Sequence, residues 1–528
     1  MPTRDFALGT RSVSAEVIGS PHMSSRTPTR HESPITSPSV YGLRQWSGWV
    51  LGPLPLLITL LVDPPAGLSA AGWHTVGAAL LMAALWICES IPIPATALLP
   101  LVLFPALGMG DIKTTTAPYA NPIIFLFLGG FVIALAMQRW NLHRRVAIGL
   151  IGALGTKPAR IVAGFLLSSA LVSMWVSNTA TALMMLPIAT SVVQLLPEHL
   201  RQRADMKAFG IALLLAVAYG ATTGGMATLI GTPPNALLAG YLSDIHGFNI
   251  GFGQWMMIGI PVTLVTLPVV YWVLTRVSFK LGTEELPGMA DLIAQEKRAL
   301  GRLSRGEWSV AVVFVLTALA WVFQPMLSKA IPMLSDTTIA MTGALALFFI
   351  PVHARRGEFV MNWESAKGIP WDVLLLFGGG LSLAGAIERH GVAKYLGTLF
   401  SGLEGVPILL SLAVVCFGIL MLTELTSNTA TAATFLPIVA AIAISLGQNP
   451  LLFVVPTALA ASCSFMLPVG TPPNAIVFGS GLITLPQMAR AGMLLNIIMV
   501  PLLILLVLLL GPWALNLQLD VIPDWVKR

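Results

Sequence analysis

The sequence predicts an all-α protein that crosses a membrane many times. Hydrophobic residues make up 56% of the 528 positions and charged residues only 10%, against roughly 25% in soluble domains, and the mean hydropathy is +0.83. Apolar runs of about 17–25 residues, the length that spans a bilayer, recur from Trp49 to Leu510. Since lipid offers no partner to bare backbone amides, and these runs lack strand alternation, we expect helices and helical hairpins.

Composition argues against several other classes of protein. The formal charge of +6 comes mainly from basic residues in short loops, where they indicate membrane topology rather than binding to nucleic acid. The cysteines lie far apart in apolar segments, so we interpret them as packing residues rather than disulfide or metal ligands. None of the eight histidines pairs with another at catalytic spacing, which leaves a histidine-based active site with little support.

The chain opens with a segment unlike the rest. Residues 1–45 are rich in Ser, Thr, Pro and Arg and lack the apolar core of a signal peptide, so a disordered tail is expected. The second apolar span is interrupted at residues 91–94, Ile-Pro-Ile-Pro, because two prolines remove backbone donors. Glu89 precedes this break, and we favour a structural cap or ion pair for it over ion binding. Helical spans are expected near residues 48–62, 73–107, 120–138, 146–155, 160–196, 208–230, 251–277, 309–324, 337–352, 371–387, 405–446, 450–481 and 489–512.

Loop charges predict the topology. The polar stretch 279–307 is too charged to cross the membrane and is expected to form a cytoplasmic surface helix that joins two halves of the chain. Three arginines at 139–145 also indicate the cytoplasm, whereas the basic flank at 389–394 is thinner. The apolar segments before these two flanks should therefore have opposite orientations, with the amino terminus inside and the carboxyl terminus outside.

An internal repeat is the strongest signal in the sequence. A Gly-rich segment, the hexapeptide Ser-Asn-Thr-Ala-Thr-Ala and the hexapeptide Gly-Thr-Pro-Pro-Asn-Ala each occur twice, in the same order. These blocks occupy residues 127–130 and 377–380, 177–182 and 427–432, and 231–236 and 470–475. Membrane proteins built from inverted repeats bind their ligands at the repeat interface, where Gly and Pro break helices. We expect the Gly-rich segments to be the tips of re-entrant hairpins.

The repeated residues suit an anion and a hard cation. Each Ser-Asn-Thr lies in an apolar run, where its polar groups need partners. Hydroxyls, amides and the free N–H groups of a helix that begins there can all donate to a carboxylate, so two copies predict one site for a two-ended anion. Sodium prefers oxygen ligands, and a hydroxyl stands one turn before each motif, at Ser173 and Thr423.

Two features of these motifs allow more than one interpretation. Small polar residues also pack and break membrane helices without binding anything, although the duplication disfavours that interpretation. Glu424 lies just before the second motif, where the first copy has Met174; we favour structural pairing for it over tuning of a sodium site.

With these motifs the chain resembles the divalent anion/sodium symporter family, which includes bacterial and animal sodium-coupled di- and tricarboxylate transporters. The resemblance covers residues 46–512 and also rests on Trp-Ile-Cys-Glu-Ser-Ile-Pro-Ile-Pro at 86–94 and Asn-Pro-Ile-Ile-Phe-Leu-Phe-Leu-Gly-Gly at 121–130. It implies a multi-pass inner-membrane protein with about eleven transmembrane helices and two oppositely oriented hairpins. It also implies a homodimer in which transport domains move as elevators against scaffold domains.

The family's functional residues carry over onto matching positions. The resemblance places a first sodium site on Ser173, Ser177, Asn178 and Gly231, and a second on Thr423, Asn428 and Gly470. It places the substrate against Ser177, Asn178, Thr179, Ser427, Asn428, Thr429, Thr471 and Pro472. The implied domains are the tail 1–45, scaffold helices 46–118, transport repeat 119–240, scaffold helices 241–366 with the linker 279–307, transport repeat 367–482, and a carboxyl-terminal helix and tail 483–528.

The expected function is sodium-coupled symport of a small dianion, such as the C4-dicarboxylate succinate. Some relatives are sodium-independent exchangers, but here the hydroxyls remain and no Lys or Arg adjoins either Ser-Asn-Thr motif. Dicarboxylate exchange, and citrate or sulfate as the substrate, stay as alternatives. An intramembrane enzyme built on Glu89 and Glu424 would lack a nucleophile–base pair or a metal motif.

Overall fold

The computed structural model describes residues 41–195, 197, 200, 202–400, 406–519 and 521–526. The predicted tail, residues 1–45, lies almost wholly outside this part of the chain. The chain divides into two units, Met1–Gly42 and Leu43–Arg528, and every element below belongs to the second.

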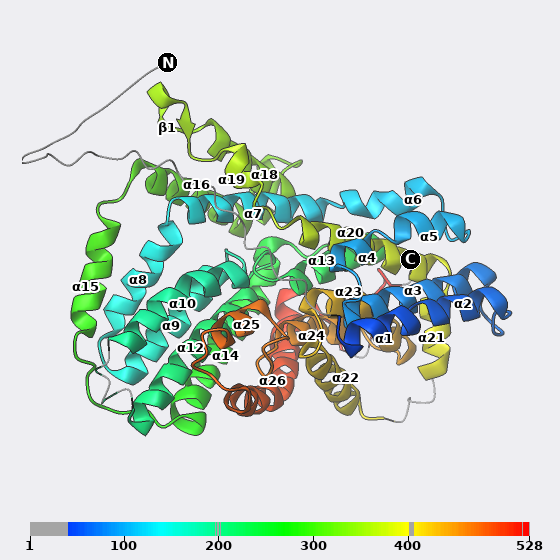
Figure 1. The fold of residues 1–528 in the computed structure, drawn as a ribbon. Helices are drawn as coiled ribbons and strands as arrows, with labels where there is room; N and C mark the ends of the chain where they lie inside the picture. The colour runs from blue at the N-terminus through cyan, green and yellow to red at the C-terminus, as the bar shows by residue number, and fades with distance from the viewer. Residues whose placement is uncertain are drawn as a thin grey trace, which may run out of the picture. The chain divides into compact units, whose positions relative to one another are not determined.

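Helices dominate the described residues, as the sequence predicts (Figure 1). Eight candidate spans in this part of the chain are long and apolar enough to cross a membrane. They contain α3 (Ala70–Cys88), α7 (Pro122–Arg139), α12 (Ala204–Gly225), α14 (Phe252–Trp272), α16 (Arg305–Val322), α20 (Trp371–Arg389), α23 (Asn428–Ser445) and α26 (Leu485–Ala514). The apolar helices α9 (Pro158–Ser173), α10 (Asn178–Gln194), α18 (Asp336–Phe349), α22 (Ile408–Thr423) and α24 (Pro450–Ser462) are shorter.

The other elements are mostly short. They are α1 (Leu43–Leu51), α2 (Pro53–Leu61), α4 (Ile93–Ala97), α5 (Pro100–Ala106), α6 (Ile112–Thr116), η1 (Ala117–Ala120), α8 (Leu142–Leu154), α13 (Pro233–His246), the π-helical η2 (Val273–Ser278), α15 (Met289–Leu300), α17 (Gln324–Ala330), η3 (Ala354–Arg356), α19 (Trp363–Ala366), α21 (Val392–Phe400) and α25 (Pro472–Phe478). Strands β1 (Pro351–His353) and β2 (Glu358–Phe359) pair antiparallel.

The spans predicted at 160–196 and 405–446 are each two helices rather than one. The break falls at Ser-Asn-Thr in both, because α9 ends at Ser173 and α10 starts at Asn178, while α22 ends at Thr423 and α23 starts at Asn428. Ser177 caps α10 by accepting a hydrogen bond from the backbone N–H of Ala180 at 3.3 Å. The hairpin tips are therefore the Ser-Asn-Thr motifs.

The Gly-rich segments are not hairpin tips, and that prediction is wrong. Residues 127–130 lie inside α7 and residues 377–380 inside α20. Glycine is needed there for close packing: a Cβ on Gly129 would lie 2.7 Å from the carbonyl carbon of Ala340 in α18, and one on Gly379 would overlap the backbone of Ala97 in α4.

The two repeats face each other across the middle of the molecule. In Figure 1 the elements α8 to α12 lie mainly on the left and α20 to α24 on the right. They meet where α10 packs against α25 and where α13 packs against α20, α23 and α24. The two repeats therefore pack directly against each other through the helices that begin at their broken segments.

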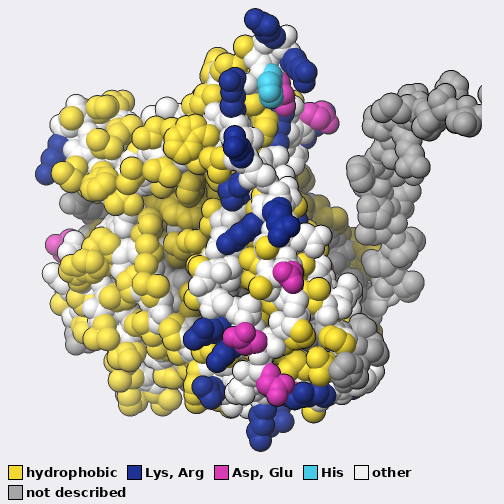
Figure 2. All heavy atoms as spheres, turned by 90° about the vertical axis from the view of Figure 1, so that its left-hand side faces the viewer, with side chains coloured by type: hydrophobic (Ala, Val, Ile, Leu, Met, Phe, Trp, Pro, Cys, Tyr) yellow, Lys and Arg dark blue, Asp and Glu magenta, His cyan; other side chains and the backbone are white. Residues whose placement is uncertain are grey.

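Basic side chains gather on one face. Figure 2 shows Lys and Arg in a band on the left-hand face of Figure 1, over the region of α8 and α15. Arg144 of α8 pairs with Glu296 of α15 at 2.7 Å, and Arg145 pairs with Glu307 at 2.8 Å. Arg145 also donates to the carbonyl oxygens of Leu300 and Gly301. The polar linker thus contains a helix, as predicted, and this helix is fastened to α8.

Close packing of α9 on α12 gives a stability test. A Cβ on Gly224 would overlap the carbonyl oxygen of Ala170 and lie 2.5 Å from its Cα, and backbone atoms cannot give way cheaply. We expect Gly224→Ala to lower the free energy of unfolding by about 1–3 kcal/mol or more, measured as a fall in Tm in detergent. The matched control is Gly149→Ala in α8, where nothing lies within 4 Å and alanine should hold or raise Tm. Equal Tm values for the two variants would contradict the packing argument.

Candidate functional site

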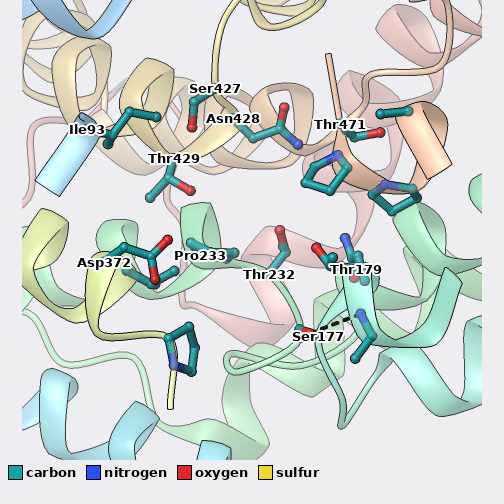
Figure 3. A pocket seen from close by; sticks show the side chains of 18 of the residues that line it. Ile93, Ser177, Thr179, Thr232, Pro233, Asp372, Ser427, Asn428, Thr429 and Thr471 are labelled. Atoms are coloured by element: carbon teal, nitrogen blue, oxygen red, sulfur yellow. Dashed lines mark hydrogen bonds between the residues drawn. The ribbon is translucent and has the colours of Figure 1, made fainter. Parts of the chain in front are cut away.

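One cavity gathers the repeated motifs. It has a volume of about 770 Å³, and both Ser-Asn-Thr tripeptides and both Gly-Thr-Pro segments line it (Figure 3). The predicted substrate residues that line it are Ser177, Asn178, Thr179, Ser427, Asn428, Thr429, Thr471 and Pro472. Segments that are far apart in sequence therefore converge on a single space.

Sequence reasoning missed several of the lining residues, and two of these belong to the repeated motifs. Thr232 and Pro233 stand opposite Thr471 and Pro472 as their repeat equivalents, and all four line the cavity. The repeated Gly-Thr-Pro-Pro was the signal that could have added them. Ser173 and Thr423 are absent from the cavity lining; both are fully buried behind it.

Four helices begin at this cavity. Helices α10 and α23 start at Asn178 and Asn428, and α13 and α25 start at Pro233 and Pro472. The first turn of a helix leaves backbone N–H groups without intrahelical partners and carries a partial positive charge. In α10 and α23 these N–H groups can donate to an anion. Helices α13 and α25 each begin with two prolines, which have no backbone N–H, so they contribute mainly their dipoles.

The first repeat groups oxygen atoms behind its hairpin tip. Ser173 Oγ donates to Asn178 Oδ1 at 2.5 Å. A Cβ on Gly225 would lie 2.6 Å from this Oδ1 and 3.1 Å from the carbonyl oxygen of Gly231. Hydroxyl, amide and carbonyl oxygens therefore lie together around one small volume, which is the ligand set that sodium prefers.

The second repeat has the same arrangement. Thr423 Oγ1 donates to the carbonyl oxygen of Ala461 at 2.8 Å and lies 2.7 Å from the carboxamide of Asn428. The same carboxamide atom lies 3.2 Å from the carbonyl oxygen of Ala461 and 3.3 Å from that of Gly470. If nitrogen faces these oxygens, it donates to them. If oxygen faces them, four oxygens converge, and a cation would balance them.

A pair of asparagines supports the two broken helices in the same way. Asn235 Nδ2 donates to the carbonyl oxygens of Thr228 at 2.8 Å and Gly225 at 3.3 Å. Asn474 Nδ2 donates to those of Leu467 at 3.0 Å and Ser464 at 3.2 Å. Both side chains thus satisfy buried carbonyls at or just beyond the point where a helix ends.

Glu424 is the main difference between the repeats. Its fully buried carboxylate accepts hydrogen bonds from the backbone N–H groups of residues 465–467 at 2.8–2.9 Å, from Ser464 Oγ at 2.9 Å and from Asn496 Nδ2 at 2.6 Å. It thereby pairs with a distant segment, the interpretation favoured from the sequence. The first repeat has Met174 here, and its backbone oxygen accepts from Thr228 Oγ1 at 2.6 Å.

Glu89 is at the cavity wall and is paired. It accepts a hydrogen bond from Arg44 Nη2 at 3.0 Å, and Arg44 also donates to the carbonyl oxygen of Ile87 at the end of α3. Glu89 has a φ of 50°, in the left-handed region that follows the end of a helix. The pair therefore helps to close the break that precedes Pro92.

The cavity contains very little charge. Among the described residues that line it, Arg44, Glu89 and Asp372 are the charged ones, and the first two neutralise each other. No free cationic side chain stands ready to balance an anion in this part of the structure.

Comparison with known proteins decides the family. A model of the sodium:sulfate symporter transmembrane region matches residues 44–517, which is most of the chain. The chain belongs to this family. It is therefore a divalent anion/sodium symporter family member and a membrane transporter, not an enzyme.

Two groups of relatives accompany this assignment. The transporter is 42% identical to the sodium-dependent dicarboxylate transporters SdcS of Staphylococcus saprophyticus subsp. saprophyticus and Staphylococcus aureus strain USA300, covering 90% of this chain and 93% of each relative. Among solved structures it resembles the YdaH transporter of Alcanivorax borkumensis, with a TM-score of 0.54, covering 89% of this chain and 97% of that chain. It also resembles MtrF of Neisseria gonorrhoeae, with a TM-score of 0.53, covering 92% and 98%. At 14% identity these two structures support the fold alone.

The two glutamates provide a matched test of the transporter's stability. We expect Glu424→Gln to lower the free energy of unfolding by about 1–3 kcal/mol, because the new amide would turn a donor toward buried donors. Glu89→Gln, which breaks a half-exposed ion pair, should cost less than about 1 kcal/mol. Thermal unfolding of both variants in detergent measures the difference, and a Tm for Glu424→Gln no lower than that of Glu89→Gln would contradict the role given to Glu424.

Proposed function

We propose that this protein carries a small dicarboxylate, succinate being the representative substrate, across the inner membrane together with sodium ions. The charge balance of the cavity carries the proposal. A dianion in a cavity without a free cationic side chain needs positive charge from elsewhere, because the desolvation of an unpaired charge is costly. Bound sodium at the two oxygen clusters would supply it.

Neutral donors would position the substrate. Hydroxyls and amides of Ser177, Asn178, Thr179 and their repeat equivalents lie on two sides of the cavity, so each could bind one carboxylate of a C4 dianion. The names of the SdcS relatives, sodium-dependent dicarboxylate transporters, agree with this choice of ion and substrate. Sodium is here a transported ion rather than a resident cofactor.

Sodium-independent exchange is the competing function. An exchanger that works without sodium needs a cationic side chain in place of the co-transported sodium ion. Arg44 is the sole cationic side chain among the described cavity-lining residues. Because Arg44 is already paired with Glu89, symport is better supported than exchange.

Elevator movement of a homodimer completes the proposal. The repeat elements in 119–240 and 367–482 would form the moving transport domain, and 46–118 and 241–366 the scaffold, with 483–528 at the carboxyl end. The basic face with α8 and α15 would lie in the cytoplasm, with the amino terminus inside and the carboxyl terminus outside. Apolar side chains of α16, such as Val315 and Leu316, are exposed and would face lipid or a second subunit.

Uptake into proteoliposomes tests the symport proposal. Labelled succinate should accumulate only with an inward sodium gradient, and Asn178→Ala and Asn428→Ala should each reduce the initial rate about tenfold or more, as expected for a lost hydrogen bond to a charged ligand. Size-exclusion profiles of both variants control for folding. Uptake that is indifferent to sodium but requires internal dianion would establish exchange instead.

A second test separates sodium from substrate. Thr423→Val keeps the shape of the side chain and removes the hydroxyl beside Asn428 and Ala461, so we expect the sodium concentration for half-maximal uptake to rise about fivefold or more. Thr426→Val is the control, since that buried hydroxyl bonds to Leu422 and Thr431 instead. A similar sodium dependence in the two variants would count against the second sodium site.

A further inference from the structure

One charged side chain among the described residues that line the cavity, that of Asp372, forms no ion pair. Of the three charged side chains among the described lining residues, Arg44 and Glu89 form an ion pair at 3.0 Å. Asp372 remains. It lies in the first turn of α20, its side chain is exposed, and no cation in the described part of the chain lies within ion-pair distance of it. A cavity suited to anions thus contains a free carboxylate.

The position of Asp372 makes this carboxylate relevant to the ligand. Figure 3 shows Asp372 projecting from α20 into the same space as Thr429 and Pro233, across from Ser177 and Thr179. It therefore stands beside the two hairpin tips without belonging to either. The first repeat offers no equivalent charge, because Pro122 begins the matching helix α7.

Size alone does not restrict what enters the cavity. Its volume of about 770 Å³ exceeds that of a C4-dicarboxylate and also that of a six-carbon tricarboxylate. The hydroxyl and amide donors do not discriminate between these two ligands either, since they can bind any carboxylate. Charge is the property left by which the cavity can distinguish these ligands.

We propose that Asp372 limits the charge of the substrate, so that dianions are accepted and tricarboxylate trianions are disfavoured. This inference rests on the proposed function. A fixed negative charge repels every carboxylate of a ligand. Two sodium ions neutralise a dianion but leave a trianion with one net negative charge, which Asp372 repels. A carboxyl group that extends beyond the two hairpin tips would also approach Asp372 most closely. Asp372 is a specificity-determining residue, and a dicarboxylate need not touch it.

A purely structural role makes a different prediction. An acidic residue in the first turn of a helix interacts favourably with the helix dipole, and its loss would lower stability whatever ligand is present. Only a charge filter changes the ratio of affinities for trianions and dianions. That ratio, rather than the rate, is therefore the quantity to measure.

Competition against sodium-driven uptake of labelled succinate tests the filter. Unlabelled citrate is compared with unlabelled succinate, at a pH where citrate is a trianion, in wild-type protein, Asp372→Asn and Asp372→Glu. In Asp372→Asn the ratio of the citrate to the succinate inhibition constant should fall about fivefold or more, the factor expected of one charge interaction at about 4 Å in water. Asp372→Glu should keep the wild-type ratio.

A second variant and a salt titration keep the test decisive if Asp372→Asn does not fold. Gln138 also lines the cavity, and Gln138→Glu should raise the ratio by adding a second carboxylate. In the wild type the ratio should fall as ionic strength rises at constant sodium, because salt screens the repulsion.

The outcomes for the two proposals differ. Wild-type succinate uptake without sodium dependence overturns the proposed function. Sodium-dependent uptake with a citrate to succinate ratio that is unchanged in Asp372→Asn, or in Gln138→Glu and at high salt, overturns the filter alone.

Discussion

The structure depends on one constraint: a helix that breaks inside a membrane exposes backbone groups that lipid cannot satisfy. Four helices begin at the same cavity, and the side chains around them satisfy the groups that these breaks release. Asn235 and Asn474 bind carbonyls in the segments that follow α12 and α24, and Glu424 binds the free N–H groups that follow α24. What stays unpaired at the hairpin tips is directed at the cavity, where a ligand can reach it.

Much of this arrangement can be predicted from the sequence. The helical class, the repeat and the convergence of both motifs follow from apolar length and from the duplicated Ser-Asn-Thr. The location of the hairpin tips does not follow, because glycine serves equally for a tight turn and for close helix packing. Gly129 and Gly379 serve the second purpose, which depends on Ala340 and Ala97, neighbours that are distant in sequence.

Pairings that cross the fold could not have been predicted either. The partners of Glu424 lie about forty and seventy residues further along the chain, and only the packing of α22 against α24 and α26 brings them together. Asp372 carries no sequence signal of its own, since an acidic residue at the start of a helix is common for reasons of stability. The internal repeat predicts only features that the two halves share. It does not predict the roles of residues that differ between them, which here include Glu424, Met174 and Asp372.

The glycines beside the hairpin tips have a consequence for how such a protein can be altered. A Cβ on Gly470 would overlap Ser464 Oγ, and one on Gly231 would overlap the backbone of Gly225, so these positions have no room even for a methyl group. Even the smallest added side chain at these two glycines would therefore displace the oxygen clusters behind the hairpin tips. The walls contributed by α4, α7 and α20, where Ile93, Gln138 and Asp372 stand outside the duplicated motifs, are where new selectivity can be engineered without rebuilding the core.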